Sequence, residues 1–162
     1  MDIRREVVRH LINELRCTTA SGLARRLGLS HTQAAYTLRT LEKMGVVVKY
    51  DVGSTHVWCI PDTSEAEAYT TVSPCFKYAE EAFRRIIHSA RGRVLTLTPR
   101  DLLRALARRD GRCTPNAFLY RTARAWLERH LDGSASIKRR GVREVEYIID
   151  VKKAREKLIA VP

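Results

Sequence analysis

The sequence predicts an α+β, mostly helical fold in which two halves each contain three helices and a β-hairpin. Apolar residues recur at helical spacing in segments that start at capping residues and stop at glycines. Two pairs of β-rich segments each enclose a turn. A polar, locally acidic stretch separates the halves. The 162 residues therefore divide into predicted domains over 1–61 and 76–162, with a linker over 62–75.

In the first half, local signals set the ends of the helices. Thr19 and Ser30 are capping residues that precede apolar-periodic segments, and Gly28 and Gly45 follow those segments. A Gly-Ser turn separates two β-rich runs. In chain order we expect a helix over 2–16, helices over 20–27 and 31–44, and a hairpin over 46–60.

The second half repeats this order of elements, although its sequence barely matches the first half. Thr98-Pro99 and Thr114-Pro115 are signatures of helix starts, and Phe118 is expected on a buried helix face. In chain order we expect a helix over 76–90, a strand over 94–97, helices over 98–111 and 114–133, a hairpin over 136–149, and a last helix capped by Asp150.

The net charge of +12 favours a polyanionic partner, of which nucleic acid is the commonest in a cell. Residues 1–70 hold nine Lys and Arg against eight Asp and Glu, whereas residues 71–162 hold twenty-one against ten. Electrostatic attraction to DNA is therefore expected mainly from the second half. A solubility feature or an Arg-rich genome is the alternative explanation.

The four cysteines, Cys17, Cys59, Cys75 and Cys113, are dispersed without a CxxC or CxC pair, so no structural zinc site is expected. His56 and Cys59 lie three apart in one predicted strand, where their side chains point to opposite faces. We interpret the cysteines as buried thiols, with a disulfide bridge as the open alternative.

One motif in the first half resembles the winged helix-turn-helix of MarR-like and ArsR-like regulators. Residues 19–30 read TASGLARRLGLS, and Leu38, Leu41 and Gly45 follow at that family's spacing. The resemblance covers about residues 5–60 and implies DNA binding. The metal-sensing cysteine pair of the ArsR type is missing, so no metal site is carried over. The second half departs from the family pattern, because Thr122 stands where a core Leu is usual and no Gly-Val pair follows the helix. Its order of elements nevertheless predicts a second winged helix.

The resemblance implies that the helix from Ser30 to Met44 enters the major groove, which is about wide enough for one helix. Gln33 suits adenine, and Arg39 suits guanine or a phosphate. Lys49 and His56 flank the wing and are expected to meet the backbone or the minor groove. A solvated helix face is the alternative. The predicted contacts are Ser30, His31, Thr32, Gln33, Tyr36, Thr37, Arg39, Lys49 and His56, with Ala35 exposed on the same face.

In the second half, the predicted hairpin tip Lys138-Arg139-Arg140-Gly141 is the most strongly basic segment. Such a tip suits a minor groove or a line of phosphates, and the alternative is a charged turn that prevents edge-to-edge aggregation. Five arginines between positions 100 and 112 lie nearby in the sequence. The predicted DNA contacts of this half are Asn116, Tyr120, Arg121, Arg124, Lys138, Arg139, Arg140 and Arg143.

These patterns predict a cytoplasmic, nucleoid-associated protein that binds double-stranded DNA as a sequence-specific transcriptional regulator. No phosphate-binding loop, GxGxxG, HExxH or GxSxG motif is present, so neither an enzyme nor a cofactor is expected. No apolar run is long enough for a membrane. The alternative is an architectural, chromosome-organising or replication-associated protein that binds DNA with little sequence preference or mainly contacts protein partners. We expect a homodimer formed through segments 2–16 and 151–160, and the sequence names no effector.

Overall fold

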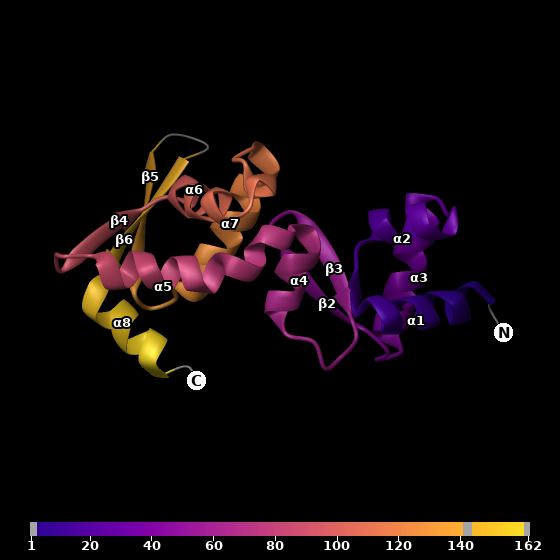
Figure 1. The fold of residues 1–162 in the computed structure, drawn as a ribbon. Helices are drawn as coiled ribbons and strands as arrows, with labels where there is room; N and C mark the ends of the chain where they lie inside the picture. Colours follow the sequence, from indigo (N-terminus) through magenta and orange to yellow (C-terminus); the bar gives the residue numbers. More distant parts are fainter. Residues whose placement is uncertain (1–2, 141–143, 161–162) are drawn as a thin grey trace. The chain divides into compact units, whose positions relative to one another are not determined.

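The computed structural model describes residues 3–140 and 144–160, and it has the predicted fold class, α+β and mostly helical. The chain forms two compact units, residues 1–74 and 75–162. Each unit contains its own three-stranded antiparallel sheet, flanked by helices (Figure 1).

Unit 1 is a helical domain with one hairpin. Its sheet has the order β1-β3-β2, so the central strand is the second strand of the hairpin. Its elements are α1 (Ile3–Leu15), β1 (Cys17–Thr18), α2 (Ala20–Leu27), α3 (His31–Lys43), β2 (Val48–Val52), β3 (Thr55–Cys59) and α4 (Glu65–Val72).

The predicted helix ends in unit 1 are confirmed. Thr19 caps α2 by accepting a hydrogen bond from the amide of Gly22, and Gly28 ends α2 in the left-handed conformation with φ of 67°. Gly45, with φ of 75°, follows α3 in the same conformation. A glycine takes this conformation without the steric cost that a Cβ atom brings. The core beneath these helices contains the fully buried side chains of Val8, Ile12, Leu23, Leu38 and Leu41.

The segment expected to be a linker, 62–75, instead contains a packed helix. Ser64 and Glu67 form a capping box that starts α4, and Ala68 and Tyr69 on its inner face are buried. The helix packs against all three strands of the sheet. Arg16 adds an ion pair with Glu67 at 3.0 Å, and this guanidinium lowers the pKa of Glu67. The polar composition describes the exposed face of α4, and its small apolar face is enough to cover the sheet.

Unit 2 is built around a longer hairpin, β5–β6. Its sheet has the order β4-β6-β5. From Pro74 onward, the elements are η1 (Pro74–Tyr78), α5 (Ala79–Ser89), β4 (Val94–Leu97), α6 (Pro99–Arg109), η2 (Gly111–Cys113), α7 (Ala117–His130), β5 (Ala135–Arg140), β6 (Glu144–Asp150) and α8 (Val151–Ala160).

The two units repeat one plan of helix, short strand, two helices and hairpin, with the short strand paired to the second hairpin strand in each sheet. Thr37 in α3 and Thr122 in α7 are both buried, and each hydroxyl donates to the carbonyl four residues earlier. Two local predictions in unit 2 are wrong. The cap of α7 is Asn116, and Phe118, in the first turn, is 39% exposed instead of buried.

The cysteines are buried, as expected, but they form disulfides instead of free thiols. Cys17 on β1 and Cys59 on β3 face each other across the sheet of unit 1. Cys75 in η1 and Cys113 in η2 are joined within unit 2. The partners are 42 and 38 residues apart, so their pairing depends on the tertiary fold.

Candidate nucleic-acid interface

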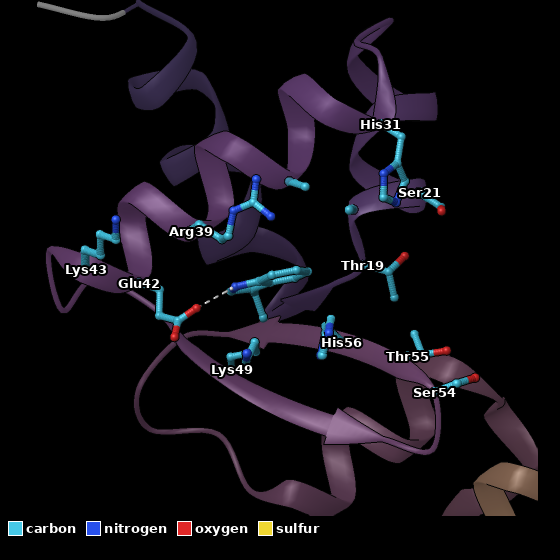
Figure 2. A pocket seen from close by; sticks show the side chains of 13 residues that line it. Thr19, Ser21, His31, Arg39, Glu42, Lys43, Lys49, Ser54, Thr55 and His56 are labelled. Carbon is cyan, nitrogen blue, oxygen red and sulfur yellow. Dashed lines mark hydrogen bonds between the residues drawn. The ribbon is translucent and has the colours of Figure 1, made fainter.

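A groove in unit 1 separates α3 from the hairpin β2–β3, and the start of α2 borders it (Figure 2). It encloses about 580 Å³. Four predicted contacts, His31, Arg39, Lys49 and His56, belong to its lining, so the fold brings helix and wing residues to one site. The other lining residues are Thr19, Ala20, Ser21, Ala35, Glu42, Lys43, Ser54, Thr55 and Trp58.

A capping box fixes the N-terminus of α3 and involves two predicted contacts. Ser30 Oγ accepts the amide N–H of Gln33 at 3.1 Å, and Gln33 Oε1 accepts the amide N–H of Ser30 at 3.0 Å. Bidentate pairing with adenine requires the glutamine oxygen as an acceptor and its nitrogen as a donor. While α3 is capped, the Gln33 oxygen is held at the Ser30 amide, so the side chain is not free to turn its oxygen and its NH₂ group together toward an adenine.

The outward face of α3 presents His31, Thr32, Tyr36 and Arg39, which are all exposed as predicted. Tyr36 is 63% exposed, an unusual position for a large aromatic side chain. Together these side chains offer an imidazole, two hydroxyls and a guanidinium. These groups can meet base edges or phosphates.

Thr37 and Ala35 are buried, contrary to the prediction. Thr37 is 3% exposed, and its hydroxyl donates to the carbonyl of Gln33 at 2.9 Å. Because it follows Ala34 by three positions and precedes Leu41 by four, it shares their buried face. Ala35 is 8% exposed and lines the groove wall. Thr37 thus has neither the exposure nor the free hydroxyl that a DNA contact needs.

Trp58 lines the groove on β3, and its side chain links the wing to α3. The indole N–H donates to Glu42 Oε1 at 3.1 Å, the dashed line in Figure 2. On the hairpin, His56 Nδ1 lies 2.6 Å from Asp51 Oδ1 in a directly opposite pair. The bond between Trp58 and Glu42 holds the hairpin against the C-terminal end of α3, whereas the His56–Asp51 pair joins the two strands of the hairpin to each other. His56 and Trp58 border the groove together with Lys49.

Unit 2 has a groove in the corresponding place, between α6, α7 and the start of β6, with a volume of about 880 Å³. All four predicted contacts on α7 and its cap line this groove. Two arginines of α6, which the sequence analysis did not select, join them. Within the described part of the chain, the lining consists of Arg100, Arg104, Pro115, Asn116, Ala117, Tyr120, Arg121, Arg124 and Glu144.

The fold already uses two of these predicted contacts. Asn116 Oδ1 caps α7 by accepting the amide N–H of Leu119 at 2.9 Å. The Tyr120 hydroxyl accepts the amide N–H of Val145 at 3.1 Å and so ties the start of β6 to α7. Both side chains are therefore structural in this unit, and Arg121 remains exposed beside them.

The basic hairpin tip is described only in part. Lys138, Arg139 and Arg140 end β5, where their backbones pair with β6. Arg143 lies outside the described residues. The predicted contact of this tip with DNA stays a prediction.

The arginines between positions 100 and 112 do not share one surface. Arg100 and Arg104 are one helical turn apart and line the groove. Arg109 pairs with Glu81 at 2.8 Å on the side of α6 that faces α5. Arg112 pairs with Asp110 at 2.6 Å, and this hydrogen bond lowers the pKa of Asp110 to about 2.

Sequence reasoning missed several residues that line the two grooves. Lys43 follows Arg39 by four positions, so helical spacing alone would have placed the two residues on the same face of α3. Arg100 and Arg104 also have this spacing, at the start of a predicted helix. Trp58 gave no such signal, because its role depends on the meeting of β3 with α3 in space.

The described part of the chain offers neither a metal site nor a membrane-spanning helix. Among residues 3–140 and 144–160, no group of three His, Cys, Asp or Glu residues is placed to hold a metal ion. Within the same residues, no helix combines the length and apolar character needed to cross a membrane.

The order of elements and the groove between helix and hairpin correspond to a winged helix-turn-helix fold. Residues 2–50 match a family described as a helix-turn-helix domain, which contains α2 and α3 and supports a DNA-binding family for unit 1. No curated protein matches the sequence.

Among solved structures, the chain is similar to the crystal structure of a hypothetical protein from Pyrobaculum spherical virus. The TM-score is 0.56 at 19% sequence identity, and the match covers 93% of this chain and 94% of that chain. At this identity the similarity concerns the fold alone, and it extends over nearly the whole length of both proteins.

Proposed function

We propose that this chain binds double-stranded DNA as a sequence-specific transcriptional regulator, with α3 in the major groove and the wing on the backbone or minor groove. One observation carries the proposal: the exposed side chains of α3 and the basic residues of the hairpin border a single groove. An α-helix fits the major groove, which is about 12 Å wide, and a hairpin beside it reaches the adjacent backbone.

Side-chain chemistry supports the assignment of base reading to unit 1. Arg39 suits guanine or a phosphate, while Thr32 and Tyr36 offer hydroxyl groups. With the oxygen of Gln33 engaged in the capping box, Tyr36 and Arg39 become the main discriminating residues. The chain is proposed to act as a cytoplasmic, nucleoid-associated DNA-binding protein without enzymatic activity.

Site selection from a random duplex pool, followed by fluorescence anisotropy, tests this proposal. Tyr36→Ala and Arg39→Ala should each lower the ratio of affinities for selected and scrambled duplexes by about tenfold, the size of one lost base contact. Arg91→Ala, at an exposed position before β4 and outside both grooves, is a charge-matched control that should leave the ratio unchanged. An unchanged ratio in both groove variants contradicts the proposal.

A second candidate function is an architectural protein with little sequence preference. The groove of unit 2 favours this function, because the described residues that line it include four arginines and one carboxylate. In that case site selection yields no consensus, and Tyr36→Ala leaves the discrimination between duplexes unaltered.

The proposed assembly is a homodimer formed through α1 and α8. Regulators that read two half-sites place two copies of one domain on the duplex, and symmetric dimers are the commonest oligomers. Sedimentation at micromolar concentration tests this assembly, and a strict monomer would exclude it.

A further inference from the structure

We infer that the arginine-lined groove of unit 2 is a sequence-independent clamp for the phosphates of duplex DNA, and that its arginines contribute directly to the salt-dependent affinity. The inference rests on the proposed DNA-binding function. It assigns the phosphate contacts to the groove between α6 and α7, in addition to the hairpin tip, which is the most strongly basic segment of the sequence.

The charged side chains that line the groove are mostly positive. Arg100 and Arg104 come from α6 and Arg121 and Arg124 from α7, and among the described lining residues only Glu144 is acidic. Guanidinium groups bind phosphate oxygens through paired, charge-assisted hydrogen bonds. A strongly positive groove of this kind attracts the DNA backbone, whatever the base sequence.

Two of these arginines are available to bind phosphate. Arg104 lies 3.9 Å from Asp101, and Arg124 lies 3.2 Å from Glu128. In the described parts of the chain, neither Arg100 nor Arg121 forms an ion pair, and both are exposed. These two guanidiniums are therefore ready to bind phosphate without first releasing an acidic partner.

The two side chains of this groove that suit base reading already form hydrogen bonds within the protein. Asn116 is the cap of α7, and Tyr120 is bonded to the backbone of β6. An asparagine amide is the usual partner of adenine, but this one is already part of the helix end. Donors that remain for a ligand in this groove are mainly guanidiniums, which recognise phosphate on any sequence.

The equivalent positions of unit 1 carry side chains of a different chemical kind. Because Thr37 and Thr122 occupy equivalent buried places, Tyr36 corresponds to Arg121 and Ala35 to Tyr120. An exposed aromatic residue of unit 1 is thus replaced by a guanidinium in unit 2. The small residue on the groove wall is replaced by a tyrosine that the fold uses. Unit 1 keeps varied side chains for bases, whereas unit 2 offers charge.

The test is a salt series on the full chain with two 20-base-pair duplexes, one of A·T pairs only and one rich in G·C. Each phosphate contact contributes about −0.9 to the slope of log affinity against log salt. Arg100→Ala combined with Arg121→Ala should make the slope shallower by about 1.8 on both duplexes. Arg91→Ala with Arg93→Ala removes the same charge outside the groove, from exposed positions before β4, and should change the slope much less.

Two results would overturn the inference. If the groove variant keeps the wild-type slope, or matches the control variant, the clamp lies elsewhere. If the loss is confined to the G·C-rich duplex, Arg121 reads guanine and the groove is not sequence-independent. Either result leaves the proposed function standing if Tyr36→Ala still lowers discrimination. A chain that binds neither duplex refutes both proposals. Circular dichroism melting confirms that each variant is folded.

Discussion

Removal of the bridge between Cys17 and Cys59 should destabilise unit 1 more than the loss of two sulfur atoms explains. Both residues are buried, and the bridge joins the short edge strand β1 to the central strand β3. Cutting it leaves the folded contacts in place but frees the unfolded chain between the two positions. The expected cost is therefore mainly an increase in the entropy of the unfolded state.

The loop length sets the magnitude. The two cysteines are 42 residues apart, and the chain-entropy relation for a loop of this size gives about 4 kcal/mol at 25 °C. For a domain of this length, 1 kcal/mol shifts the melting temperature by about 4–8 °C. We therefore expect a decrease in melting temperature of about 15–30 °C for unit 1.

The tryptophans allow the two units to be followed separately, because Trp58 is buried in unit 1 and Trp126 in unit 2. In a Trp126→Phe background, urea unfolding of unit 1 is followed by Trp58 fluorescence, for the oxidised chain, the reduced chain, and Cys17→Ala with Cys59→Ala. Reduction keeps both sulfur atoms, so the comparison separates the bond from the packing.

Two outcomes would refute this reasoning. Equal unfolding free energies for the oxidised and reduced chains would mean that the bridge does not constrain the unfolded state. Alkylation of four thiols in the oxidised, denatured chain would mean that the bridges are absent. As a control, Cys75→Ala with Cys113→Ala should leave the Trp58 transition nearly unchanged, because that bridge lies in unit 2.

Two further predictions concern single carboxylates. Glu42→Ala should increase non-specific DNA affinity by removing the groove's acidic lining residue, yet lower stability by about 1–2 kcal/mol because the buried Trp58 N–H loses its acceptor. Glu42→Gln, which keeps an acceptor, should increase affinity with little loss of stability, and anisotropy with urea unfolding separates the two effects. Asp110 has a pKa lowered to about 2, first by the hydrogen bond from the Arg112 side chain. The folded-state pKa lies below the unfolded value, so this contribution to stability is complete above pH 4 and is lost as the pH falls toward 2. Comparison of the wild type with Asp110→Asn by Trp126 fluorescence isolates this contribution, and parallel pH profiles would contradict it.

Local signals in the sequence were sufficient for most of the fold. Thr19, Ser30, Thr98 and Asp150 cap helices as predicted, because a capping residue acts on amides within three positions of itself. The same kind of signal was present at Ser64 and Glu67 but was obscured by the polar composition around it. The predicted linker was wrong for this reason.

Features that depend on contacts between distant residues were not predictable. The disulfide partners, the link between Trp58 and Glu42, and the attachment of Tyr120 to the wing all join positions far apart in the sequence. For the candidate site, the sequence predicted which residue types could contact DNA. It did not predict which of those side chains form hydrogen bonds within the protein.

In the proposed complex with DNA, these hydrogen bonds limit which side chains at the start of α3 are free to discriminate bases. Opening the capping box costs about 0.5–2 kcal/mol, and a bidentate contact with adenine gains about 1–3 kcal/mol. For Gln33 these amounts nearly cancel, so its net preference for adenine is small. Tyr36 lies one turn further along α3, and reading a base with its exposed ring disrupts no cap. Sequence discrimination in unit 1 is therefore expected to centre on Tyr36 and Arg39, while the first turn of α3 mainly fixes the position of the helix on the duplex.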